Sequence, residues 1–292
     1  MELKKKLVPE VAAIHDLSGY GRSALTVCIP VLSAMGVQVC PLPTAVLSSQ
    51  TDGFENYAML DLAGFMPEIA KHWEQLEIGF DAIYSGFLGS AGQISFVGDF
   101  IRRFKRPGQI VLVDPVLGDG GIPYGPINGN HIKGMKHLIK HADIITPNVT
   151  EASMLLRRDI KTAFSVNEIK DWLYTLAAAG PRGVMITSVP VEHEDSYAVC
   201  VYDKSEDIYM KFPFTLIPGT YPGTGDTFAS IVLGGMLKGN SIPASVNKAL
   251  KFLSATIELT NKTGSPYRNG LALEAMLPEL WKENCDEAYE KL

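Results

Sequence analysis

The sequence predicts an α/β fold built around a central, mostly parallel β-sheet. Short apolar runs alternate with helix-length segments along most of the 292 residues, which is the pattern of repeated strand and helix units. Residues 109–113 form a continuous apolar run of the kind expected for a strand buried on both faces. No linker, internal repeat or low-complexity tract divides the chain, so we expect a single domain over residues 1–292.

Composition and charge exclude several classes of function. An apolar content of 46% with 20% charged residues is typical of a globular protein. The net charge of −6 and the absence of any basic run longer than residues 4–6 argue against nucleic-acid binding. No signal-peptide pattern and no membrane-spanning window occurs, which predicts a cytoplasmic protein. The cysteines follow no metal-binding or redox pattern and are expected to pack in the core. They are Cys28, Cys40, Cys200 and Cys285.

The first half of the chain predicts a βαβ beginning followed by further alternation of strands and helices. After an N-terminal extension (1–10), we expect strands at 11–14, 37–42, 80–84 and 109–113, and helices at 23–35, 67–76 and 93–104. Glycines and prolines then crowd residues 116–128, which show little periodicity. A loop of this length directly after a strand is often a lid, so we expect one here.

The second half predicts the remaining strands and helices. We expect parallel strands at 142–145 and 183–188, an antiparallel pair at 197–202 and 208–213, and helices starting near 148 and spanning 166–178, 226–238, 241–260 and 271–292. The spacing of Asn148 and Glu151 matches a capping box at a helix start. The same amide and carboxylate would also suit Mg²⁺ at a strand end, although the cap is the favoured interpretation from these residues alone.

One stretch, residues 222–229, combines a glycine turn, a carboxylate and an immediate helix start. Gly223 and Gly225 allow a tight turn whose N–H groups point at an anion. The unpaired N–H groups of a helix start can hold a phosphoryl group, while Asp226 could accept a proton from an attacking hydroxyl. The alternative is a plain loop with Asp226 as the helix N-cap.

Polar side chains follow four of the predicted strands, at the end where each strand finishes. They are Asp16 and Ser18, Asp114 and Asp119, Asn148 and Glu151, and Thr187 and Ser188. Because the carboxyl ends of parallel strands meet at one edge of a sheet, these groups are expected to join Asp226 in a phosphoryl-transfer site. The sequence contains no P-loop, no protein-kinase signature and no complete dinucleotide-binding fingerprint, so a different kinase design is indicated.

Three ordered motifs resemble those of the ribokinase-like superfamily, in its vitamin-kinase branch. They are Gly-Thr-Gly-Asp at 223–226, Asp-Pro-Val-Leu-Gly-Asp at 114–119 and Thr-Pro-Asn-Val-Thr-Glu at 146–151. Residues 85–93, 187–188 and 19–21 most resemble pyridoxal/pyridoxamine kinases, and the likeness runs from about residue 11 to 262. It implies a three-layer αβα sandwich. The helix expected at 23–35 follows the first strand too soon to admit the β lid of the sugar kinases.

The resemblance implies ATP-dependent phosphorylation of the 5′-hydroxymethyl group of a vitamin B6 vitamer. Asp226 would be the general base, and Gly223, Thr224 and Gly225 would hold the transferred phosphoryl group. The Mg·ATP side would comprise Asp114, Asp119, Asn148, Glu151, Thr187 and Ser188, with Asp119 and Glu151 nearest the Mg²⁺. The substrate side would comprise Asp16, Ser18, Val46, Thr51 and Phe87. Residues 116–128, with Tyr124, would form a flap over ATP. A homodimer is also implied, while a requirement for a monovalent cation such as K⁺ stays open.

Two departures from the family pattern concern the substrate. Many members carry Ser where Asp16 stands, and an aspartate there would favour a protonated ring nitrogen or the aminomethyl arm of pyridoxamine. Phe87 replaces a frequent Tyr, which removes a hydroxyl. Two alternatives remain: hydroxymethylpyrimidine kinase, whose substrate is chemically close, and a non-catalytic sensor of nucleotide or vitamer on the same fold.

Overall fold

The computed structural model of the chain describes residues 7–194, 196–219, 221–282 and 286–292. The first six residues of the expected N-terminal extension, and Cys285, lie outside the described residues. The chain forms two compact units. Unit 1 comprises Met1–Ile83, Arg106–Gln109 and Ile217–Ala288, and unit 2 comprises Tyr84–Lys105, Ile110–Leu216 and Tyr289–Leu292. The expectation of a single domain stays a prediction.

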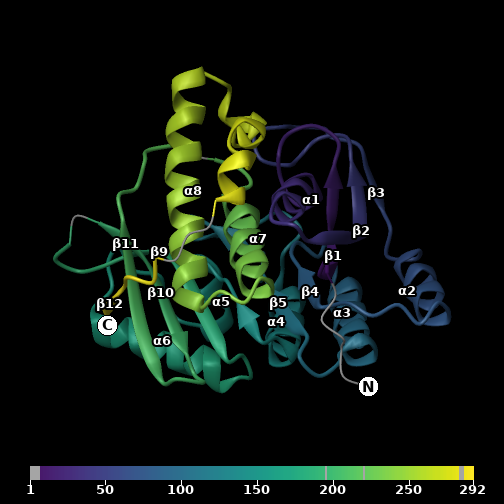
Figure 1. Cartoon of the computed structure of the whole chain (residues 1–292), viewed down its shortest axis with the longest axis horizontal. Helices are drawn as coiled ribbons and strands as arrows, with labels where there is room; N and C mark the ends of the chain where they lie inside the picture. Colours follow the sequence, from purple (N-terminus) through teal and green to yellow (C-terminus); the bar gives the residue numbers. More distant parts are fainter. Residues whose placement is uncertain (1–6, 195, 220, 283–285) are drawn as a thin grey trace. The chain divides into compact units, whose positions relative to one another are not determined.

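Among its described residues, unit 1 contains three paired strands and four α-helices. The strands are β1 (Glu10–Ser18), β2 (Gln38–Leu47) and β3 (Met59–Asp61), with β1 and β2 parallel and β3 antiparallel to β2. The helices are α1 (Leu25–Ala34), α2 (Met66–Gln75), α7 (Thr224–Leu237) and α8 (Ile242–Thr263). Figure 1 shows α7 and α8 side by side, and Gly235 permits this contact because a Cβ there would lie 2.6 Å from the Ser245 Oγ.

Unit 2 continues the strand and helix alternation. In hydrogen-bonded order its strands are β5 (Ile110–Val113), β8 (Ile144–Ile145), β9 (Gly183–Pro190), β10 (Tyr197–Asp203), β11 (Ile208–Phe214) and β12 (Glu290–Lys291). The pairs β5–β8 and β8–β9 are parallel, and the remaining pairs are antiparallel. The helices are α3 (Ala91–Phe104), α4 (Gly129–Leu138), α5 (Val149–Leu156) and α6 (Val166–Ala178). Strand β4 (Ala82–Ser85) lies where the chain passes from unit 1 into unit 2.

Most of the predicted elements are confirmed, and the reasons are local. Ser165 and Glu168 form a reciprocal capping box at the start of α6, so that helix begins and ends where its pattern predicts. The antiparallel pair β10–β11 also occupies its predicted position. The α/β class with a mostly parallel sheet is therefore correct. No helix among the described residues combines the length and apolarity needed to cross a membrane.

Besides the short strand β3, which was not predicted, three longer segments differ from the sequence prediction. Residues 116–128 are not only loop, because β6 (Gly118–Asp119) and β7 (Ile122–Pro123) pair as a short antiparallel hairpin. Helix α4 was not predicted, since Gly129 and Gly134 weaken its helical pattern.

The third difference is the expected C-terminal helix at 271–292, a prediction that is wrong. Short 3₁₀ turns occupy Leu273–Ala275 and Leu277–Trp281, and Glu290–Lys291 pair with β11 as β12 (Figure 1). Pro278 stands at the start of the second turn and lacks the N–H that a continuing α-helix would need. Lys211 of β11 binds the Glu290 carboxylate at 2.8 Å, so the end of the chain is held as a strand.

Candidate active site

The amino end of α7 has the glycine turn that the sequence predicts. Gly223 precedes the helix with φ of 85°, and its carbonyl accepts hydrogen bonds from the Thr227 N–H at 2.9 Å and the Thr227 hydroxyl at 2.7 Å. A Cβ at this position would lie only 2.5 Å from the Arg22 carbonyl oxygen, so the turn requires glycine. Among the described residues, no side chain caps α7, which leaves its first N–H groups suited to an anion.

Asp226 lies in the first turn of α7, and its carboxylate is held by backbone. The Ala24 N–H donates to Oδ2 at 2.8 Å, and Ala24 itself has an unusual positive φ of 50°. The side chain is 17% exposed. Burial raises the pKa of Asp226 to about 6, with a smaller contribution from the charge of Asp16, while the Ala24 N–H opposes the rise. A carboxylate with this pKa can take up a proton near neutral pH, as a general base must.

The structure brings Asp16 and Ser18 to the same end of β1. Ser18 donates its hydroxyl proton to Asp16 Oδ2 at 3.1 Å, and the Ser23 hydroxyl donates to Ser18 at 3.3 Å. Asp16 is buried, and this burial raises its pKa. Val46 lies at the end of β2, which pairs with β1, and Thr51 follows in the next turn; both side chains are exposed.

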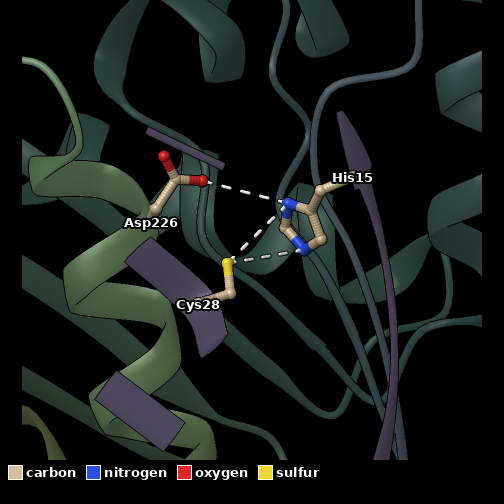
Figure 2. A group of neighbouring side chains, drawn as sticks. All are labelled: His15, Cys28 and Asp226. Carbon is tan, nitrogen blue, oxygen red and sulfur yellow. Dashed lines mark hydrogen bonds and ion pairs between the residues drawn. The ribbon is translucent and has the colours of Figure 1, made fainter. Parts of the chain in front are cut away.

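His15 and Cys28 are neighbours of Asp226 that sequence reasoning missed (Figure 2). The His15 Nδ1 lies 3.9 Å from Asp226 Oδ1, and the Cys28 sulfur lies 4.0 and 3.9 Å from Nδ1 and Nε2 of the same ring. Burial lowers the pKa of His15 to about 3, so its imidazole is neutral. The position of His15 beside Asp16 at a strand end was an available signal. Cys28 on α1 carried none.

In unit 2, the buried Glu151 is the centre of an acidic cluster that also includes Asp114 and Asp119. Its Oε1 accepts the Leu117 N–H at 3.2 Å and its Oε2 the Asn148 N–H at 2.8 Å, while Asn148 Oδ1 accepts the Glu151 N–H at 2.9 Å. The predicted capping box is therefore confirmed. Burial and the charge of Asp114 raise the pKa of Glu151 well above its usual value. The Thr146 hydroxyl donates to Asp114 Oδ1 at 3.1 Å, a partner that sequence reasoning missed.

The hairpin of β6 and β7 is tied to the start of α5. The Asn148 side chain donates to the Gly118 carbonyl at 2.9 Å, and the Gly121 N–H donates to the Thr150 hydroxyl at 2.9 Å. Asp119 is exposed and its charge also raises the pKa of Glu151. Tyr124, in the expected flap, is 42% exposed.

The remaining predicted residues of unit 2 are Thr187, Ser188 and Phe87, and the first two lie within β9, which continues to Pro190 instead of ending at residue 188 as predicted. Thr187 of β9 pairs with Asn148 as an isolated parallel bridge, so the structure joins it to the acidic cluster. Ser188 has φ of 57° and an exposed side chain. Phe87 is half-buried in the loop after β4. Two residues later, the Gly89 N–H donates to the Gln93 side chain at 2.8 Å, which anchors this loop on α3.

Known proteins share this fold. A Bacteroides thetaiotaomicron candidate phosphomethylpyrimidine kinase, crystallised with pyridoxal, is 44% identical, covers 98% of this chain and 100% of its own, and overlays with a TM-score of 0.92. Pyridoxal kinase from Lactobacillus plantarum is 28% identical to this chain and overlays with a TM-score of 0.86. The overlay covers 94% of this chain and 97% of that kinase. These overlays confirm the ribokinase-like fold.

Curated relatives carry similar names but differ in length. A Schizosaccharomyces pombe protein described as a pyridoxal kinase is 31% identical over 163 residues, which are 53% of this chain and 46% of the relative. The chain spans about half the length of that relative and of the bifunctional thiamine biosynthetic enzyme TH1 from Arabidopsis thaliana. The family model for phosphomethylpyrimidine kinase matches residues 19–269. With that match covering most of the sequence, this chain belongs to the phosphomethylpyrimidine kinase family, among relatives that include pyridoxal kinases.

Proposed function

We propose that this protein is a kinase that transfers the γ-phosphoryl group of ATP to the 5′-hydroxymethyl group of a vitamin B6 vitamer. One observation carries the proposal: Asp226, with a pKa of about 6, stands in the first turn of a helix whose glycine turn is suited to an anion. A proton acceptor beside a phosphoryl-binding helix start is what transfer to an alcohol requires. The similarity to a protein crystallised with pyridoxal supports a B6 vitamer as the acceptor.

In this proposal, the acceptor side is built around Asp226 of unit 1. Asp226 takes the proton of the substrate hydroxyl as the oxygen attacks phosphorus, and the N–H groups of Gly223, Thr224 and Gly225 stabilise the charge on the phosphoryl oxygens. Side chains of several kinds then orient the vitamer ring. They are Asp16, Ser18, Val46, Thr51 and Phe87.

In this proposal, the nucleotide side consists of the acidic cluster of unit 2, which is Asp114, Asp119 and Glu151, and of its polar neighbours. Its members would be Asp114, Asp119, Asn148, Glu151, Thr187 and Ser188. Because Asp114 and Asp119 both raise the pKa of Glu151, a divalent cation near these carboxylates would relieve their mutual repulsion. The donor set therefore fits Mg²⁺, with Asp119 and Glu151 as the groups that hold it directly or through water. Bound Mg²⁺ would neutralise phosphate charge.

We also propose that the protein is a homodimer. Strand β3 is paired with β2, and its apolar residues Met59 and Leu60 are 50% and 62% exposed; nearby Phe65 is 55% exposed. Exposed apolar side chains on a short edge strand are suited to contact with a second copy of the chain.

A second candidate substrate is hydroxymethylpyrimidine. The description of the matching family favours it, since that family is named for phosphomethylpyrimidine kinase. The pyrimidine carries a hydroxymethyl group on a flat heteroaromatic ring, so Asp226 would perform the same proton transfer on either substrate.

The test is ATP-dependent turnover of pyridoxal, pyridoxamine, pyridoxine and hydroxymethylpyrimidine, each offered separately with Mg²⁺. Asp226→Asn should lower kcat by at least roughly a hundredfold with little change in nucleotide affinity, since it removes the proton acceptor. Asp171→Asn is the control, because Asp171 is an exposed residue of α6 that pairs with Arg158. Turnover of the pyrimidine alone would replace the B6 proposal. No turnover of any substrate would favour the non-catalytic sensor.

A further inference from the structure

We propose that His15, Cys28 and Asp226 form a binding site for a thiophilic divalent cation of the zinc class, and that a cation bound there inhibits the kinase by occupying its base. The three residues come from β1, α1 and α7, and their side chains are neighbours in Figure 2. The inhibition rests on the proposed function. The binding itself does not.

The spacing of the three donor atoms fits a small metal ion. One ligand atom from each residue lies within 4.8 Å of the others. The His15 Nδ1 is 3.9 Å from Asp226 Oδ1 and 4.0 Å from the Cys28 sulfur. Tetrahedral zinc, with bonds of about 2.0–2.3 Å, sets neighbouring ligand atoms roughly 3.5 Å apart. Closing the site therefore requires the Nδ1–Oδ1 and Nδ1–sulfur distances each to shorten by roughly half an ångström. The His15 and Cys28 side chains must also rotate, because the sulfur now lies almost equally far from both ring nitrogens.

The chemistry of the donors selects the metal class. Thiolate, imidazole and carboxylate together are the ligands of zinc sites, whereas Mg²⁺ takes oxygen ligands and keeps several waters. This set therefore differs from the all-oxygen cluster around Glu151 in unit 2. Three protein ligands leave a fourth position open for water or a substrate oxygen.

The protonation states suit coordination. Because burial lowers the pKa of His15 to about 3, the imidazole is neutral, which is the form that binds a metal ion. On binding, the Cys28 thiol loses its proton to solvent and its sulfur bonds the cation.

Burial gives the site one open side. The His15 side chain is fully buried and Cys28 is buried, while the Asp226 side chain is 17% exposed. A cation can therefore arrive at Asp226 and be retained by the two inner ligands. Once Asp226 Oδ1 is a metal ligand it can no longer take a substrate proton, so bound cation and active base exclude each other.

Binding is tested on the purified full chain, with Zn²⁺ titrated in a buffered free-metal system and Co²⁺ as the spectroscopic probe. We expect one equivalent of zinc and a cobalt–thiolate charge-transfer band. Cys28→Ser should abolish the band and weaken zinc binding by at least about tenfold, because a serine hydroxyl is a poor zinc ligand. Cys40→Ser is the matched control and should keep both, since Cys40 lies on β2 outside the cluster.

Inhibition is tested at saturating Mg²⁺ and ATP. For each protein, wild type or variant, turnover with free zinc is divided by the turnover of the same protein without zinc. Zinc should lower turnover of the wild type and of Cys40→Ser, but not of Cys28→Ser. Failure to bind zinc, or equal binding by wild type and Cys28→Ser, would overturn the site. Zinc that is displaced by Mg²⁺ would point to the acidic cluster and also overturn it. Cys28-dependent binding in a protein without kinase activity would keep the site and refute the proposed function alone.

Discussion

At the scale of single residues, Asp226 combines two properties that oppose each other. Its burial raises the pKa to about 6, which makes it a useful base, but the same burial makes the charged form costly in the folded protein. Only one hydrogen bond to the ionised oxygens is described, from the Ala24 N–H. A residue kept for its chemistry at the expense of stability is common in active sites.

This cost predicts that Asp226→Asn stabilises the protein at neutral pH. The folded-state pKa of about 6 lies above the usual value of 3.8, so the folded state binds more protons and stability falls as the pH rises from about 4 through 6. Above pH 6 the full cost is present, and the asparagine variant should be more stable by about 1–3 kcal/mol. Urea unfolding at several pH values measures this difference, which should shrink as the pH falls toward 4. A variant less stable than the wild type at pH 7 would contradict the account.

At the scale of elements, two helices begin with the same device but stand in different surroundings. Helices α5 and α6 each start with a reciprocal capping box, with Glu151 and Glu168 in equivalent positions. Glu151 is buried beside Asp114, whereas Glu168 is half-buried and pairs with Lys161. Comparing variants of these two glutamates therefore distinguishes the effect of helix capping, which both share, from an effect on Mg²⁺ binding, which we expect only for Glu151.

Accordingly, Glu151→Gln should raise the Mg²⁺ concentration needed for half-maximal turnover by about tenfold, as the loss of a group that supports a metal site commonly does. It should also lower the melting temperature, since the Gln NH₂ group cannot accept the second backbone N–H. Glu168→Gln makes the same change at the equivalent capping position of α6, where the glutamine oxygen can still accept the Ser165 N–H, and it should leave the Mg²⁺ requirement unchanged. An equal Mg²⁺ requirement in wild type and Glu151→Gln would leave Glu151 with the capping role alone.

At the scale of the whole molecule, the exposed apolar side chains on and near β3 predict self-association. The chain mass is 31.8 kDa, so light scattering should give twice this mass for the wild type. Leu60→Glu places a charge on the edge strand and should shift the mass toward 31.8 kDa, because burying an unpaired carboxylate in an interface is costly. Ile160→Glu, at a similarly exposed position in unit 2, is the control and should remain dimeric. A monomeric wild type would refute the dimer.

Much of the fold was predictable because its signals are local. The start of α6 lies in Ser165 and Glu168, three residues apart, and the turn before α7 lies in a glycine that no other residue can replace. Patterns of this kind act over one turn of chain, so the sequence determined the α/β class, most of the helices and the position of Asp226. Where the local pattern was weak, as in α4 with its two glycines, the prediction failed.

Tertiary structure decided what no local pattern contains. His15, Cys28 and Asp226 are brought together from β1, α1 and α7, although more than half of the chain separates the first two from the third. The pKa values of His15 and Asp226 follow from burial, which is a property of the packed unit and not of any short stretch of sequence. The sequence by itself therefore determined which reactive groups the protein carries. Packing decided which of them share one desolvated site, because burial and distance exist only once the chain is folded.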